Sequence, residues 1–142
     1  MPLVKDLLQS KGTAIYSVGP DNPVLDAIKT MAERRVGALL VMKGDELVGI
    51  MSERDYARKV ILLGRSSSDT SVAQIMSSPV HTVTPRHSVE ECMRLVTEQR
   101  VRHLPVVENG RVLGVISIGD LVKAVIEEQR QTIEQLEDYI HR

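Results

Sequence analysis

The sequence is poor in several residue types that functional sites are often built from. Its 142 residues include no Phe, no Trp, three Tyr and one Cys. Proteins that bind single-stranded nucleic acid by stacking need aromatic side chains, and this chain offers few. The single cysteine, Cys92, excludes an intrachain disulfide and any metal site made of several thiolates. The composition therefore predicts a core of Val, Ile, Leu, Met and Ala.

Charge and hydropathy exclude two further classes of protein. The net charge is −1, so the chain is not a generally basic protein that coats DNA, and nucleic acid is not an expected partner. It has no run of about 18 apolar residues, the length that spans a membrane. Residues 1–12 lack the apolar segment of a secretory signal. We expect a soluble, cytoplasmic protein that makes no membrane contact.

The main feature of the chain is an internal repeat. After a shift of 65 residues, Ile15–Tyr56 aligns with Val80–Leu121 without a gap, and eleven pairs are identical. The first-copy members of these pairs are Val18, Pro20, Val24, Glu33, Arg35, Val36, Leu39, Val41, Gly49, Ser52 and Asp55. Two copies of so long a unit predict a pseudo-dimer within one chain rather than a solenoid.

Each copy is predicted to form the same β-α-β-β-α unit, so the fold class is α/β (α+β). Apolar residues recur at helical spacing in 23–35 and 88–100, where Pro23 suits a first helical turn and Ser88 an N-cap. Asn109–Gly110 is typical of a hairpin turn between two strands. The expected strands are 15–18, 38–42 and 47–52 in the first copy and 80–83, 103–107 and 112–117 in the second.

The polar segment 65–71 predicts a linker. We therefore expect the first repeat at 1–64, the second at 72–126 and a C-terminal helix at 127–142. Short leading helices are expected at Val4–Leu8 for the first copy and Val72–Met76 for the second. In the C-terminal stretch 126–142, a coiled-coil-like seam interrupted by Gln129 contains Ile126, Ile133, Leu136 and Ile140. This helix either packs on its own domain or binds a partner.

The most specific motif is Gly-x-x-Ser-x-x-Asp, at Gly49–Asp55 and again at Gly114–Asp120. It lies where a strand ends and a helix begins, so unpaired backbone N–H groups there favour an anion. An ionised Asp one turn later has acceptor oxygens for the paired hydroxyls of a ribose. The same spacing also fits a capping box, which has no ligand. Basic residues around both motifs, among them Arg58 and Lys59, favour a phosphate.

Four segments carry a family resemblance: RVGALLV and GIMSERD in the first copy, RVRHLPV and GVISIGD in the second. Together they resemble a stand-alone pair of CBS (cystathionine-β-synthase) domains, the Bateman module, over about residues 15–126. The resemblance implies a cleft between the repeats with two pseudo-symmetric sites for an adenosyl ligand. That ligand is AMP, ADP, ATP or NAD(H), with S-adenosylmethionine ranked behind them, and no metal is expected.

The resemblance also assigns ligand-binding residues. Asp55 and Asp120 match the ribose-binding aspartates, and Ser52 and Ser117 match the hydroxyls beside them. The other matching positions are Ile15, Tyr16, Val36, Gly37, Ala38, Arg54, Val80, His81, Val101, Arg102, His103 and Ile116. Gly119 stands where the first copy has Arg54, so the second site lacks one cation unless Arg102 and His103 supply it. We expect the two sites to be unequal.

No catalytic motif is present, so we do not expect an enzyme. Cys92 is best interpreted as a small buried residue, and the histidines lack ligand spacing. Two functions stay open: a nucleotide sensor, or a dimerisation or scaffolding module with no physiological nucleotide. The resemblance implies a homodimer, and an effector protein of unknown identity is a further partner. The expected dimer faces are Val24, Ile28, Met31, Tyr56, Val60, Met93, Val96, Leu121 and Val125.

Overall fold

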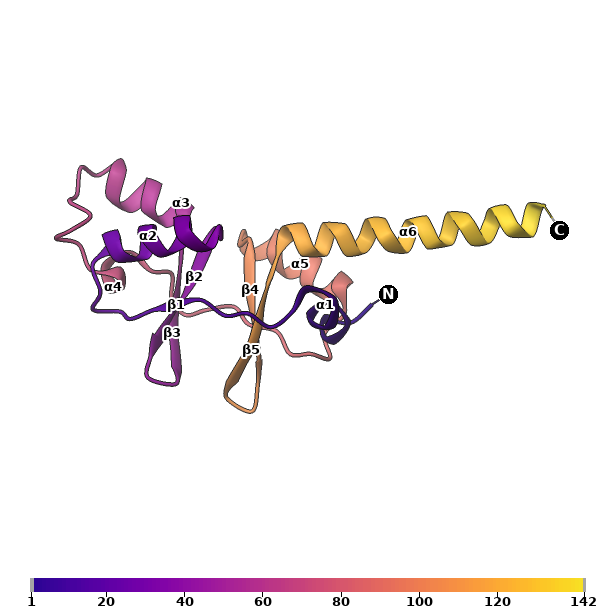
Figure 1. The fold of residues 1–142 in the computed structure, drawn as a ribbon, viewed down its shortest axis with the longest axis horizontal. Helices are drawn as coiled ribbons and strands as arrows, with labels where there is room; N and C mark the ends of the chain where they lie inside the picture. The colour runs from indigo at the N-terminus through magenta and orange to yellow at the C-terminus, as the bar shows by residue number, and fades with distance from the viewer. Residues whose placement is uncertain (1, 142) are drawn as a thin grey trace. The chain divides into compact units, whose positions relative to one another are not determined.

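The structure, a computed structural model, describes residues 2–141 (Figure 1). It contains two compact units. The first-repeat unit comprises Ile15–His81, and the second-repeat unit comprises residues 2–14 together with 82–141. Each unit combines a small sheet with helices, so the predicted α/β class is confirmed. Within residues 2–141 no helix is both long enough and apolar enough to cross a membrane.

The first-repeat unit is built on a three-stranded sheet. Strand β1 (Ser17–Val18) is parallel to β2 (Ala38–Lys43), which is antiparallel to β3 (Glu46–Ser52). Its helices are α2 (Val24–Arg34), α3 (Glu53–Tyr56) with a π-helical continuation at Ala57–Ile61, and α4 (Val72–Ile75). Pro23 is the N-cap of α2 and not its first-turn residue, because its ψ of 146° is extended. The buried cluster consists of Val, Ala, Met, Leu and Ile, as the composition predicts.

The second-repeat unit repeats this plan with one strand fewer. Its elements are α1 (Val4–Lys11), α5 (Val89–Gln99), β4 (His103–Glu108), β5 (Arg111–Ser117) and α6 (Ile118–Ile140). The strand expected at 80–83 does not form: only Val83 makes a parallel bridge, to Val106. Ser88 caps α5 as predicted, with its Oγ accepting the N–H of Glu91. The φ angles of Asn109 (52°) and Gly110 (76°) are those that the predicted Asn-Gly hairpin turn needs.

The compact units differ from the division of the chain into 1–64 and 72–126, because the two leading helices are exchanged. Helix α1 precedes the first repeat in sequence but belongs to the second-repeat unit, and α4 belongs to the first-repeat unit. The backbone bonds that hold them correspond one to one. Val72 and Ala73 donate to Asn22 and Pro20 in the first-repeat unit. The matching donors in the second-repeat unit are Val4 and Lys5, whose acceptors are His87 and Pro85.

Two glycines of the repeated motif explain how the exchanged helices fit. A Cβ at Gly49 on β3 would lie 2.5 Å from Sδ of Met76, directly after α4. A Cβ at Gly114 on β5 would lie 2.7 Å from Cδ2 of Leu8 on α1. Both distances are too short for real atoms, so glycine lets each leading helix pack against its strand. The glycine of the motif thus serves packing in both copies.

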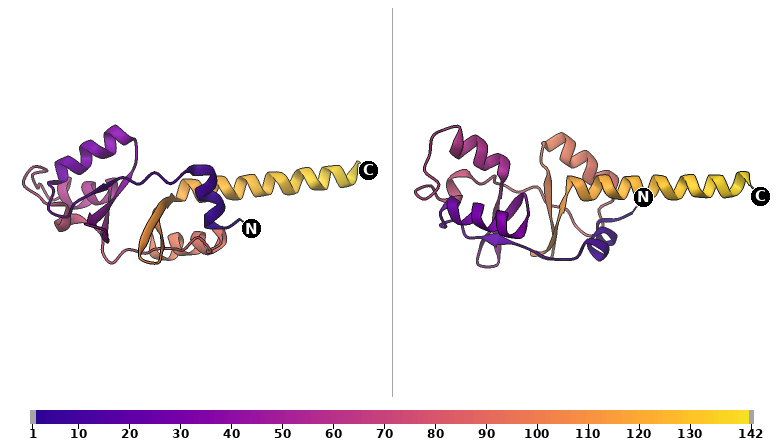
Figure 2. Two further views of the ribbon diagram at one scale, coloured as in Figure 1. Left: turned by 60° about the horizontal axis from the view of Figure 1, so that its bottom comes forward. Right: turned by 45° about the horizontal axis from the view of Figure 1, so that its top comes forward.

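Helix α6 is partly unsupported by its own unit. Figures 1 and 2 show it continuing past α5 and α1, and every residue from Gln129 to His141 is exposed. The part of α6 from Gln129 to His141 therefore does not pack back on its own domain, one of the two options left open by the sequence, whereas Leu121 near its start is buried in the core. The expected dimer faces need correction as well. Val24, Met31 and Val60 are buried in the first-repeat core, and Val96 and Leu121 in the second, because these residues face their own sheets.

Candidate functional site

Both copies of the Ser-x-x-Asp motif form the capping box that their spacing allows. In the first-repeat unit Oγ of Ser52 accepts the N–H of Asp55 at 3.2 Å, and Oδ2 of Asp55 accepts the N–H of Ser52 at 3.0 Å. In the second-repeat unit Ser117 and Asp120 make the same two bonds, at 3.2 and 2.8 Å. Each hydroxyl also donates to its Asp. The motif therefore stabilises helix starts in both units, whether or not it also binds a ligand.

The unpaired N–H groups expected at these helix starts are partly used. The N–H of Glu53 donates to the carbonyl of Gly37, and the N–H of Ile118 donates to the carbonyl of Arg102. The capping serines take the N–H groups of Asp55 and Asp120. An anion at either helix start would thus meet fewer free donors than the sequence pattern suggests.

The two aspartates differ in their remaining contacts. Oδ1 of Asp55 accepts the hydroxyl of Ser77 at 3.2 Å and lies 3.4 Å from Nζ of Lys59. Lys59 also donates to the carbonyl of Ile75 at 2.9 Å. Both oxygens of Asp55 therefore have partners, and the residue is only 9% exposed. This carboxylate mainly holds α3 and α4 together.

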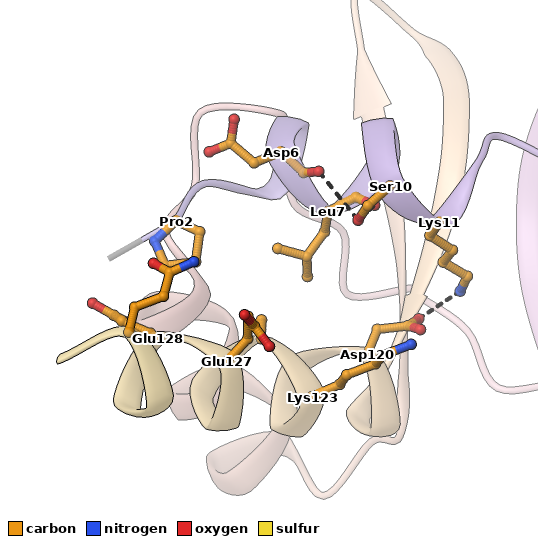
Figure 3. A pocket seen from close by; sticks show the side chains of 11 residues that line it. Pro2, Asp6, Leu7, Ser10, Lys11, Asp120, Lys123, Glu127 and Glu128 are labelled. Atoms are coloured by element: carbon orange, nitrogen blue, oxygen red, sulfur yellow. Dashed lines mark hydrogen bonds and ion pairs between the residues drawn. The ribbon is translucent and has the colours of Figure 1, made fainter. Parts of the chain in front are cut away.

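Asp120 is held differently, by a lysine from the exchanged helix α1. Nζ of Lys11 lies 2.5 Å from Oδ2 of Asp120 and donates to the carbonyl of Val115 at 2.6 Å. Figure 3 shows the two side chains pointing toward each other from α1 and α6. The hydrogen bonds that the described residues make to Asp120 all reach Oδ2. Oδ1 keeps its acceptor capacity, and the side chain is 25% exposed.

Electrostatics at this site follow from the same contacts. Burial opposes ionisation of Asp120, but the hydrogen bonds from Lys11 and Ser117 outweigh it, so the pKa of Asp120 lies below its usual value. His103 begins β4, and its main-chain partner in the sheet is Ser117. Burial is the largest cause of the lowered pKa of His103. The charges of Lys11 and Arg102 lower that pKa further, while Asp120 opposes them. The imidazole is therefore neutral near pH 7.

A pocket of about 880 Å³ opens beside this ion pair, between α1 and α6 of the second-repeat unit (Figure 3). Lys11, Asp120 and Lys123 line one part of it, and Asp6 and Glu127 line another. Its walls thus carry both signs of charge. The Lys11–Asp120 pair is accessible from this side to a polar molecule.

The other predicted positions fall into three groups. Val36, Gly37 and Ala38 lie at the start of β2 and Val101, Arg102 and His103 at the start of β4, as expected. Ile15 and Tyr16 precede β1, and the ring of Tyr16 lies under the guanidinium of Arg34, 5.2 Å away. Arg54 is exposed and forms no ion pair with another described residue.

Three predicted ligand-binding positions need correction. Val80 and His81 were matched to the second copy, yet they belong to the first-repeat unit and lie in no strand. The reason is that Ser77, just before them, pairs with Ile50 on β3. The side chain of Ile116 is fully buried in the second-repeat core, so only its backbone can face a ligand.

The remaining reactive side chains have structural roles. Cys92 is buried, and burial raises its pKa to about 11, so the thiol stays protonated at neutral pH. Nδ1 of His87 accepts the N–H of Thr84 at 2.9 Å and thereby holds a turn. Within residues 2–141 no cluster of three or more His, Cys, Asp or Glu is arranged to hold a metal ion.

Comparison with known proteins identifies the repeat. The sequence profile of the CBS domain matches residues 4–61 and 72–127. The chain belongs to the CBS-domain family. It is a tandem CBS pair, a regulatory module. The chain is 42% identical over 146 residues to the CBS domain-containing protein CBSX3, mitochondrial, of Arabidopsis thaliana. That alignment covers 96% of this chain and 71% of the Arabidopsis protein.

Solved CBS structures have the same fold. A CBS-domain protein from Burkholderia ambifaria is 52% identical, with a TM-score of 0.86 over 89% of this chain and 96% of that one. The CBS domain pair of protein MJ0100, solved in complex with 5′-methylthioadenosine and S-adenosyl-L-methionine, has a TM-score of 0.80 at 21% identity. That alignment covers 90% of this chain and 98% of the solved domain pair. At this identity the likeness establishes the fold alone.

Sequence reasoning missed one residue of this CBS pair, Lys11. It lies 109 residues from Asp120 in the chain, outside the aligned repeats, and on a helix assigned to the other copy. No motif marks it. The only available signal is its place in the last turn of α1, where a basic residue is also favoured by the helix dipole. Its role is visible only after α1 is placed on the second-repeat unit.

Proposed function

We propose that this CBS pair is a nucleotide sensor that binds an adenosine phosphate (AMP, ADP or ATP) or NAD(H) and passes a change of conformation to a partner. The main support for this proposal is that Asp120 is a partly exposed carboxylate. Its Oδ1 accepts no hydrogen bond from the described residues and is available to a ligand. A ribose offers two neighbouring hydroxyl donors to such an acceptor. Lys11 and Arg102 supply positive charge in the same unit.

The family likeness supports the same class of ligand. MJ0100, which has the same fold, is described in complex with two adenosyl compounds. In our proposal the backbone and side chains at the start of β4 (Val101, Arg102 and His103) and at the start of α6 (Ser117 and Asp120) contact the ligand. Of the two aspartates, Asp120 is the better ribose acceptor, because Asp55 is covered and occupied on both oxygens.

Two observations favour the second candidate, a dimerisation or scaffolding module without a nucleotide. The capping boxes satisfy both serines and give each aspartate a structural task, so the motif does not require a ligand. In addition, Ile126, Ile133 and Leu136 of α6 are 52–57% exposed, as in a helix that meets a partner. We propose a homodimer in either case.

A thermal-shift panel tests the sensor against the scaffold. The protein is heated with AMP, ADP, ATP, NAD, NADH or S-adenosylmethionine, each compared with a sample lacking ligand. A ligand present at a hundred times its Kd adds about 2.7 kcal/mol to the free energy of unfolding. We expect a phosphate-bearing ligand to raise Tm in the wild type and less so in Asp120→Ala. No shift with any of these compounds at millimolar concentration would leave the scaffold as the function.

A further inference from the structure

We propose that Lys11, carried by the exchanged helix α1, makes the Asp120 site selective for adenosyl ligands with a negatively charged 5′ group. Such ligands are adenosine 5′-phosphates, and the disfavoured ones carry a neutral thioether or a cationic sulfonium. This inference rests on the proposed function, and it adds which member of the ligand class the site accepts. The selectivity would come from the contacts of the Lys11 ammonium.

The charge around Asp120 favours an anionic 5′ group. The Asp120 carboxylate alone would attract a cationic ligand such as S-adenosylmethionine. Nζ of Lys11 lies 2.5 Å from its Oδ2, so the pair together carries no net charge. Arg102, near His103, adds positive charge, and the pocket wall adds Lys123 together with the acidic Asp6, Glu127 and Glu128 farther from the pair. A sulfonium beside Asp120 would therefore meet a cation, and a phosphate would not meet an uncompensated anion.

The hydrogen-bonding capacity of Lys11 favours the same group. An ammonium has three N–H donors, and Lys11 uses two of them, for Val115 and for Asp120. One donor is left for a ligand. In an adenosyl ligand the 5′ carbon is attached to the ribose ring beside the carbon that bears the 3′ hydroxyl. A ribose held by Oδ1 of Asp120 thus brings its 5′ group close to the ammonium.

The first-repeat unit differs in this respect. Ser77 and Lys59 reach Oδ1 of Asp55 there, and the carboxylate is nearly covered. Lys59 also contacts its aspartate and one backbone carbonyl, that of Ile75, so it too keeps a donor. Both oxygens of Asp55 have partners, however, so none is left to hold a ribose beside that donor. Selectivity for a charged 5′ group is therefore a property of the second-repeat unit.

The test is a calorimetric titration of full-length protein with AMP, 5′-methylthioadenosine and S-adenosylmethionine. The variants are Lys11→Met, Lys11→Arg and the control Lys5→Met, a change of an exposed lysine on the same helix. We expect Lys11→Met to lower the AMP affinity relative to S-adenosylmethionine about tenfold or more, the size of one charge-assisted hydrogen bond. Lys11→Arg keeps the charge and should keep the preference for AMP, and Lys5→Met should match the wild type.

A second readout shows whether the site is built as described, without any ligand. The NMR titration of His103 should give a higher pKa in Lys11→Met than in wild type, because the charge of Lys11 lowers that pKa. An unchanged ratio of AMP to S-adenosylmethionine affinity in Lys11→Met overturns the inference and leaves the proposed function intact. If wild type binds none of the three compounds and the thermal-shift panel finds no other adenosyl ligand, the proposed function fails, and the selectivity of Lys11 fails with it.

Discussion

Lys11 and Ser77 contact equivalent groups in the two repeats, Lys11 through an ammonium and Ser77 through its hydroxyl and backbone. Ser77 pairs its backbone with Ile50 and donates its hydroxyl to Asp55. Lys11 reaches the repeat equivalents of both groups, the carbonyl of Val115 and the carboxylate of Asp120, with one ammonium. In the first-repeat unit the hydroxyl of Ser77 and the ammonium of Lys59 both reach Oδ1 of a nearly buried carboxylate. In the second-repeat unit the ammonium of Lys11 reaches Oδ2 of a partly exposed carboxylate, and Oδ1 is left available.

The two aspartates should respond differently to removal. Asp120→Ala should weaken binding of AMP by about 1.5–3 kcal/mol, the range for a hydrogen bond to a charged group. Asp55→Ala should leave AMP affinity nearly unchanged while it lowers the free energy of unfolding by about 2–3 kcal/mol, because it removes a cap and the bonds to Ser77 and Lys59. Asp120→Ala also loses a cap and an ion pair, so AMP affinity is what separates the two variants. Calorimetric titration and urea unfolding of both variants provide the measurement. Equal loss of AMP affinity in the two variants would contradict the assignment of the ligand to Asp120.

Substitution of the packing glycine should destabilise the second-repeat unit. Gly114→Ala places a methyl group against Leu8 and should cost about 1–3 kcal/mol of stability as α1 is pushed off β5. Gly119→Ala is the matched control, since its Cβ would meet only Oγ of Ser117, at an ordinary 3.6 Å. That control should be neutral or stabilising by up to about 1 kcal/mol, because alanine favours the helix. Chemical denaturation of both variants decides, and a Gly114→Ala protein as stable as wild type would disprove close packing.

Acid should remove the contribution of the Lys11–Asp120 pair. The pKa of Asp120 is lowered in the folded state, so the unfolded state binds more protons as pH falls below about 4. The stability that the pair provides is therefore present above the unfolded pKa and is lost as pH falls through the folded one. We expect wild type to be more stable than Lys11→Met at pH 6, with the difference shrinking on acidification toward pH 2. Urea unfolding across this range measures it, and a difference independent of pH would show that the ion pair contributes nothing.

The exposed stripe of α6 should carry dimerisation. Removing residues 127–142 should shift the protein toward monomer, because it deletes Ile133, Leu136 and Ile140, which have no cover in their own unit. Leu136→Glu should have the same effect, whereas Gln131→Glu, a change of an exposed polar residue of α6, should not. Light scattering at micromolar concentration reports the mass. A truncated protein that dimerises as tightly as the full chain would place the interface elsewhere.

The sequence by itself determined the repeat and most of its elements. Hydrophobic spacing and turn chemistry predicted α2, α5 and both hairpins, and Ser88 was identified as a cap, because these features depend on neighbours a few residues apart. The family followed from the motifs around Ser52 and Ser117. Both interpretations of Ser-x-x-Asp, capping and ligand binding, were consistent with the pattern. The structure establishes capping in each copy.

Only the tertiary structure decided which side chains meet each motif. The alignment of the repeats makes Asp55 and Asp120 equivalent, but α1 and α4 are exchanged between the units, so one meets Ser77 and the other Lys11. The order of the chain assigns each leading helix to the repeat that follows it, and no local pattern overrides that order. The exchange is set by contacts between residues far apart in sequence, such as Leu8 against Gly114. Such contacts arise from the shape of the packed units, which a periodic pattern does not encode.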